Sequence, residues 1–172
     1  MIGTRTKAAL AGALILLAAS AATAGAGAGG VERASLNGFA EVPTLAAAGT
    51  GTFRADVNAA ADRINYTLRF NGLGSPVQQA HIHLGRTGTA GGISAWLCDS
   101  AAAPGPAGTP ACPAPGTALT QVIRPAEVQA IAAQGLQGGQ FNRLVRAIRA
   151  GATYVNVHTA AFGSGQIRGQ IG

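Results

Sequence analysis

The sequence predicts an all-β fold, an antiparallel Greek-key β-sandwich or barrel with one short helical insertion. Three observations lead to this prediction. Short apolar runs alternate with polar residues at a period of two, turns rich in Gly and Pro separate these runs, and only one segment has a clear helical period. A parallel α/β architecture would need several long helices between its strands, and the sequence has no such set.

The predicted strands follow one another at short intervals along the chain. The clearest covers residues 64–70, where Ile, Tyr, Leu and Phe alternate with Asn, Thr and Arg. It forms a predicted hairpin with residues 52–57. Further strands are expected over residues 77–84, 93–97, 153–159 and 165–171. The segment after residue 112 is expected to be a Pro-rich loop, with a weak helical turn at Pro125.

One segment near the C-terminal end has the period of a helix. Its apolar residues recur at the spacing of one helix face, at Phe141, Leu144, Val145 and Ile148. The sequence therefore predicts a short helix with one buried side. The arginines off this stripe, and one on the last strand, are candidate contacts for an anion or a partner: Arg143, Arg146, Arg149 and Arg168. The alternative for the helix arginines is a solvated face.

The first 24 residues have the three parts of a secretory signal peptide. Arg5 and Lys7 form its basic start, an apolar stretch follows, and Ala22-Thr23-Ala24 offers a cleavage site. Residues 25–30 are then a flexible leader, and the domain is expected to cover residues 31–172. This organisation predicts a secreted or periplasmic protein of bacterial type, with no transmembrane segment after cleavage.

The charged residues are spread along the chain. The formal net charge of +6 falls to +4 without Arg5 and Lys7, and the ten remaining arginines form no run. A nucleic-acid-binding arm is therefore not indicated. The six acidic residues are scattered, and no serine or cysteine has a catalytic motif around it. These features favour a non-enzymatic module that binds an unknown extracytoplasmic protein or surface.

Cys98 and Cys112 are the only two cysteines. In an oxidising compartment an isolated pair most simply forms one disulfide. The residues between them are rich in Ala, Gly and Pro, so a cross-link would restrain a loop with little regular structure. A thiolate metal site would need more cysteines. Trp96, the only tryptophan, is expected to pack beside the disulfide.

All three histidines lie on predicted strands. His81 and His83 are two residues apart, so their side chains point to the same face. His158 lies in another alternating segment, on the face opposite two valines. Three imidazoles on one non-core face would suit a copper ion or, less well, zinc. The alternative is that His81 and His83 hold the following loop by hydrogen bonds and pair with Asn156 or Thr159.

Six motifs occur in order along the chain: LNGFAEVP (36–43), GTGTF (49–53), INYTLRFNGL (64–73), AHIHLGRTGTAG (80–91), YVNVHT (154–159) and GQIRGQI (165–171). This series resembles the CHRD family, whose domain is repeated in the animal protein chordin and occurs singly in many bacterial secreted proteins. The resemblance spans residues 31–172 and implies an extracellular module. The bone morphogenetic proteins bound by chordin belong to animals and are not implied here. The long insertion between the cysteines departs from the usual pattern.

The order of the histidine strands is also distantly similar to the copper/zinc superoxide dismutases. An H-x-H strand, a long loop, a V-x-V-H strand and a closing G-x-I-R-G-x-I strand follow one another. By that likeness, His81, His83 and His158 would correspond to copper ligands. The chain has no further histidine for a bridging ligand or a zinc site. The likeness therefore implies at most a mononuclear copper or zinc site.

Overall fold

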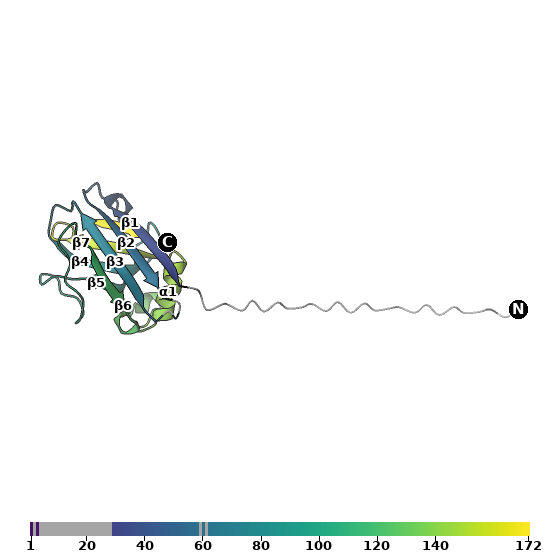
Figure 1. The fold of residues 1–172 in the computed structure, drawn as a ribbon. Coiled ribbons are helices and arrows are strands. Elements are labelled where there is room, and N and C mark those ends of the chain that lie inside the picture. Colours follow the sequence, from purple (N-terminus) through teal and green to yellow (C-terminus); the bar gives the residue numbers. More distant parts are fainter. Residues whose placement is uncertain (2, 4–28, 59, 61) are drawn as a thin grey trace.

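The computed structural model describes residues 1, 3, 29–58, 60 and 62–172. Most of the predicted signal peptide (1–24) and most of the predicted leader (25–30) therefore lie outside the described residues. The described chain forms eight strands, one α-helix and three short 3-10 helices (Figure 1). In this part of the chain, no helix has the length and apolarity needed to cross a membrane.

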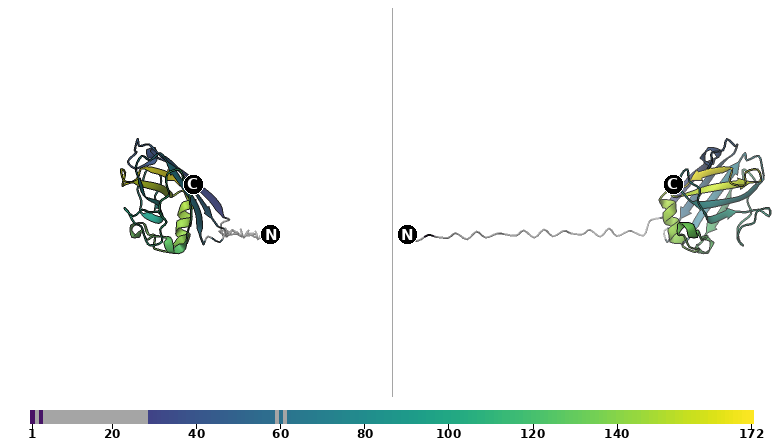
Figure 2. Two further views of the ribbon diagram at one scale, coloured as in Figure 1. Left: turned by 60° about the vertical axis from the view of Figure 1, so that its left-hand side comes forward. Right: turned by 180° about the vertical axis from the view of Figure 1, so that it is seen from behind.

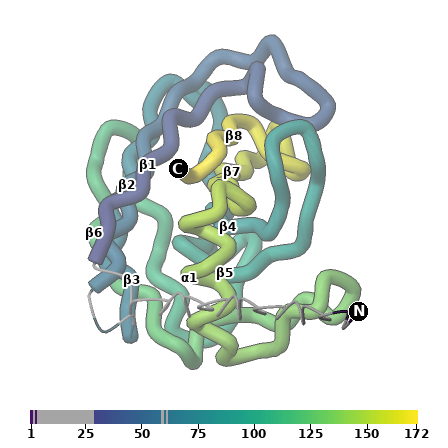
Figure 3. Tube along the Cα trace, turned by 90° about the vertical axis from the view of Figure 1, so that its right-hand side faces the viewer, coloured from purple at the N-terminus to yellow at the C-terminus, as the bar shows by residue number. Residues whose placement is uncertain are grey.

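All eight strands belong to one antiparallel, nearly closed sheet. They are β1 (Gly30–Asn37), β2 (Thr50–Val57), β3 (Ile64–Asn71), β4 (Val77–Leu84), β5 (Ile93–Cys98), β6 (Leu119–Ile123), β7 (Thr153–Thr159) and β8 (Ile167–Gln170). Their order across the sheet is β5-β4-β7-β8-β1-β2-β3-β6. β1 and β8 pair only at Asn37 and Arg168, and the sheet folds there into two facing groups of strands (Figures 2 and 3). The predicted fold class is confirmed.

The period of two in the sequence explains how the core is filled. In β3 the apolar positions Ile64, Tyr66, Leu68 and Phe70 are buried, and the residues between them are exposed or half-buried. Apolar side chains of the other group of strands, such as Ile82, are fully buried against the same core. Each such burial stabilises the fold by about 1.5–3 kcal/mol.

The helix α1 (Phe141–Arg149) covers one side of this core, between the two groups of strands (Figure 3). Its buried residues are Phe141, Leu144, Val145 and Ile148, so the predicted apolar stripe is confirmed. The remaining surface of the helix faces outward.

The strand β6 was not predicted from the sequence, because it lies in the segment expected to be a Pro-rich loop. It pairs with β3 alone, and only Ile123 among its five residues is buried. A short edge strand with one buried side chain gives too weak an alternation to be detected. The 3-10 helix Pro125–Glu127 follows it, where the sequence indicates a helical turn.

The disulfide joins Cys98, at the end of β5, to Cys112 in the loop before β6, as the sequence predicts. The loop between the cysteines has few regular contacts of its own, and its ends are joined by hydrogen bonds such as that from Cys112 N to Asp99 O (2.8 Å). The cross-link therefore contributes to holding this loop on the sheet.

Replacing both cysteines by serine should destabilise the protein by roughly 3 kcal/mol. The sequence separation of the cysteines is 14 residues, and the chain-entropy model assigns about 3 kcal/mol to a loop of this size. Urea unfolding followed by circular dichroism measures the difference. A reductant should destabilise the wild-type protein and leave the double-serine variant unchanged. Equal stability of the two proteins under oxidising conditions would contradict the prediction.

Candidate metal centre

The three histidines come from the neighbouring strands β4 and β7. β4 carries His81 and His83, and β7 carries His158. The antiparallel register places His81 opposite Asn156 and His83 opposite Tyr154. One ring nitrogen from each histidine lies within 4.8 Å of the others. The structure therefore brings together the three residues that the sequence predicts as ligands.

The histidine face lies opposite the core, and loops cover it. Ile82 and Val157, on the core face of β4 and β7, are completely buried. His81 is only 1% exposed, and His83 and His158 are each 9% exposed. Any ion held by these side chains would be screened from bulk water.

Backbone carbonyl groups of two covering loops fix the orientation of two histidines. His83 Nδ1 lies 2.9 Å from the carbonyl oxygen of Gly91, and His158 Nδ1 lies 3.0 Å from that of Gly163. A carbonyl oxygen only accepts hydrogen bonds, so each Nδ1 carries the proton and each Nε2 keeps a lone pair. Contacts of this kind set the tautomer and direction of metal-binding histidines.

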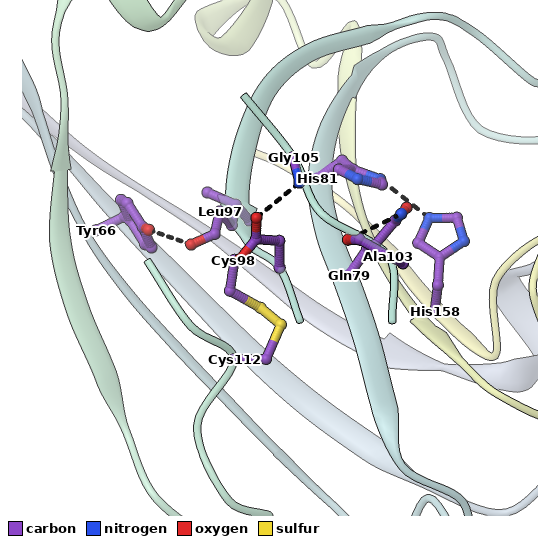
Figure 4. The surroundings of a disulfide bond; sticks show 10 residues. Tyr66, Gln79, His81, Leu97, Cys98, Ala103, Gly105, Cys112 and His158 are labelled. Carbon is purple, nitrogen blue, oxygen red and sulfur yellow. Dashed lines mark hydrogen bonds between the residues drawn. A yellow bond between two sulfur atoms is a disulfide. The ribbon is translucent and has the colours of Figure 1, made fainter. Parts of the chain in front are cut away.

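The third histidine, His81, contacts His158 directly. Its Nδ1 lies 3.1 Å from His158 Nε2 (Figure 4). Because His158 Nε2 has the lone pair, His81 Nδ1 is the donor, and His81 Nε2 also keeps a lone pair. The Nε2 atoms of His81 and His83 are buried and have no hydrogen-bond partner among the described residues. Two unpartnered buried acceptors in one cluster are unusual, and a cation would satisfy both.

The spacing of these nitrogens suits a single metal ion. Ligand nitrogens placed 2.0–2.1 Å from one ion lie about 3.3–3.6 Å apart in tetrahedral or trigonal geometry. In the metal-free protein, the hydrogen bond from His81 Nδ1 (3.1 Å) occupies the lone pair of His158 Nε2, so a bound ion would take the place of this bond. The three ligand atoms already lie within 4.8 Å of one another, so a small side-chain movement would bring them to the spacing that one ion needs. The three residues therefore fit a copper or zinc ion.

Burial keeps the three imidazoles in the form that binds metals. The pKa of His81 is lowered to about 2, first by burial and then by His158 and His83. Burial lowers the pKa of His83 to about 4, against an opposing effect of its hydrogen bond to Gly91. Burial also lowers the pKa of His158. All three side chains are therefore neutral at neutral pH, as metal binding requires.

Two aromatic rings enclose the histidines. Trp96 meets His81 edge-on, with ring centroids 4.2 Å apart, and Tyr154 stacks on His83 at 4.8 Å with an interplanar angle of 3°. A Cβ on Gly105 would lie 2.6 Å from Cε3 of Trp96, so the backbone of the disulfide-closed loop packs directly on the indole. The disulfide loop thus supports one wall of the site.

A buried cation, Arg168, lies beside the histidines. It is 3% exposed, and its guanidinium carbon is 3.4 Å from the centroid of the Tyr154 ring. Its Nη2 donates to the carbonyl oxygens of Arg86 (3.0 Å) and Thr89 (2.8 Å). This candidate anion contact is therefore buried, and its Nη2 is directed at neutral backbone groups.

A buried acid, Glu41, lies close to Arg168 but outside the histidine cluster. Its Oε1 accepts a 2.6 Å hydrogen bond from Asn156 Nδ2. Burial raises the pKa of Glu41 to about 7, against an opposing effect of Arg168. The carboxyl group is therefore only partly ionised at neutral pH.

The other candidate partner contacts lie apart from the histidines. Arg143, Arg146 and Arg149 are exposed on α1, which packs on the core side of the sheet. Arg143 Nη1 donates to the carbonyl oxygen of Gly135 (3.3 Å). The structure does not bring these three arginines to the metal centre.

The hydrogen-bonding alternative for the histidines describes part of what the structure shows. His83 does hold the loop that follows β4. Asn156, however, donates to Glu41, and Thr159 donates to Gln166. Sequence reasoning missed the carbonyl groups that orient the histidines, because a backbone group leaves no signal in the sequence.

The chain matches the family model described as the CHRD domain over residues 33–171. No curated protein and no solved structure matches it, so the likeness to the superoxide dismutases has no support from solved structures. The matched range contains the three histidines, both cysteines and all of α1. Since it covers nearly the whole chain, the protein belongs to the CHRD domain family.

Proposed function

We propose that this CHRD domain is a non-enzymatic, extracytoplasmic module that binds one copper ion, or zinc less well, through His81, His83 and His158. The observation that carries the proposal is the pair of buried, unpartnered Nε2 atoms on His81 and His83. Imidazole nitrogens suit copper and zinc. A role in storing or delivering the metal fits a site built from three ligands and no described acid in the cluster.

Two further features support an exported binding module. The disulfide between Cys98 and Cys112 is of the kind that persists in oxidising compartments. The exposed arginines of α1 offer a surface to an anionic partner on a different side of the domain from the metal site.

Copper binding should fall at least about 100-fold in the double variant His81→Ala/His83→Ala, because two of three ligands are lost. The wild-type protein, exported and purified without a histidine tag, should hold one equivalent by elemental analysis. Fluorescence gives a reading specific to the site, since the single tryptophan lies 4.2 Å from the His81 ring by centroid distance and should be quenched on binding.

A variant with Arg143, Arg146 and Arg149 all changed to Gln is the matched control, and it should bind copper as the wild type does. Absence of stoichiometric metal, or equal metal in the double-alanine variant, would overturn the proposal. Circular dichroism of each variant shows whether it has folded. Turnover of superoxide by the copper-loaded protein would contradict the non-enzymatic role.

A further inference from the structure

We propose that the three-histidine site is selective for Cu(I), the monovalent ion, over Cu(II) and Zn(II). This inference rests on the proposed function and adds to it the oxidation state of the metal. It follows from the charge of the donor set, the charge of the surroundings and the burial of the site.

The donor set carries no negative charge. Among the described residues, no cysteine, aspartate or glutamate joins the three histidines in the cluster. A bound ion would therefore keep its full charge in a site whose ligands are at most 9% exposed. The Born cost of burying an ion grows with the square of its charge, so a divalent ion is disfavoured about fourfold more than a monovalent one.

A buried positive charge lies beside the site. Arg168 lies over the ring of Tyr154, and the same ring stacks on His83. Because its Nη2 is directed at carbonyl oxygens, Arg168 is not neutralised by an ion pair there. Glu41 lies close to Arg168, but burial raises the pKa of its carboxyl group to about 7, so it is only partly ionised and offsets the arginine charge only in part. A cation there repels a divalent ion twice as strongly as a monovalent ion at the same position, because the Coulomb energy is proportional to the charge of the ion.

The enclosure of the site limits the number of ligands. Trp96, Tyr154 and the loops that carry Gly91 and Gly163 cover the histidine rings. Zn(II) sites are almost always four-coordinate and Cu(II) prefers a tetragonal arrangement, so both need ligands beyond three imidazoles. Cu(I) is satisfied by three nitrogen donors, and the cluster holds three imidazoles.

Affinities for the three ions test the inference. The affinity for Cu(I) is measured anaerobically by competition with a chromogenic Cu(I) chelator. The affinities for Cu(II) and Zn(II) are measured by competition with chelators of known affinity. We expect Cu(I) to bind at least 100-fold more tightly than Cu(II), which raises the potential of the bound couple by about 120 mV at 59 mV per tenfold. Cu(II) or Zn(II) binding as tightly as Cu(I) would overturn this inference alone. If none of the ions binds, the proposed function itself fails.

Two variants of Arg168 test whether its positive charge causes the preference for Cu(I). Arg168→Gln removes the cation and should narrow the Cu(I)-to-Cu(II) affinity ratio at least tenfold, whereas Arg168→Lys keeps the charge and should preserve the ratio. Circular dichroism shows whether each variant is folded. An unchanged ratio in a folded Arg168→Gln protein would contradict the electrostatic argument. If that variant does not fold, the wild-type ratio decides the inference.

Discussion

The substitution Gly91→Ala should destabilise the protein by about 3–5 kcal/mol and weaken copper binding about 10- to 100-fold. A Cβ on Gly91 would overlap the carbonyl oxygen of Leu84, so the loop after β4 must move. That movement breaks the hydrogen bond from His83 Nδ1 to Gly91 O (2.9 Å) and the one from Gly91 N to Tyr154 Oη (3.2 Å). Forced repacking costs about 1–3 kcal/mol, and each lost buried hydrogen bond adds about 1 kcal/mol.

The loss of metal affinity has a separate cause. Once the carbonyl group of residue 91 has moved away, the Nδ1 proton of His83 has no fixed acceptor, and the ring is free to turn or change tautomer. Loss of such an orienting partner typically lowers metal affinity about 10- to 100-fold. Urea unfolding of the metal-free protein and copper titration of the folded variant measure the two effects independently.

Gly163→Ala is a closely matched control. The carbonyl oxygen of Gly163 holds His158 as that of Gly91 holds His83. A Cβ on Gly163, however, would meet nothing within 4 Å. This variant should stay within about 0.5 kcal/mol of the wild type and keep its copper affinity. Equal losses in both variants would show that the close approach at Gly91 is not the cause.

The contrast between these two glycines shows where sequence reasoning stops. The alternation of side chains along a strand predicts that His81, His83 and His158 share one face, because successive residues of a strand point to opposite faces of the sheet. It also identifies the apolar stripe of α1. Nothing in the composition of the loops shows that Gly91 touches the carbonyl of Leu84 while Gly163 faces open space. Those relations depend on how the loops fold back over the sheet.

The burial of the histidine face also depends on how the loops fold, so the sequence does not predict it. From alternation alone, a face opposite the core is expected to be solvated, since polar side chains of an antiparallel sheet usually point to water. In the structure, Trp96 and three loops cover that face, and the disulfide restrains one of them. This cover lowers the pKa values of the histidines. It also makes the affinity of the site depend strongly on the charge of the bound ion.

The metal-free protein should lose stability as the pH falls through the range where free histidine titrates. Unfolding raises the pKa of His81 from about 2, and that of His83 from about 4, to the ordinary 6.5. Between these values the unfolded chain binds protons that the folded chain does not, so acid favours unfolding. His158 acts in the same direction, because burial also lowers its pKa.

Glu41 opposes this trend. Its pKa is about 7 in the folded protein and 4.5 in its ordinary state, so between these values the folded chain holds the extra proton and acid favours folding. His81 and His83 against one carboxyl group leave a net uptake of about one proton on unfolding near pH 5.5, and His158 adds to this uptake. At about 1.4 kcal/mol per proton and pH unit, the free energy of unfolding should drop by about 1.4 kcal/mol or more between pH 6 and pH 5.

Urea unfolding at several pH values, with a chelator present, measures the slope of the free energy of unfolding against pH. Two variants separate the contribution of the histidines from that of Glu41. His83→Gln removes one titrating histidine and should make the slope shallower, whereas Glu41→Gln removes the opposing carboxyl group and should make it steeper. A slope that is flat in the wild type, or unchanged in both variants, would contradict the assignment. Bound metal should steepen the acid dependence further, because the ligands must stay unprotonated to hold it. The loss of metal and the loss of the fold on acidification are therefore expected to be linked through the same three side chains.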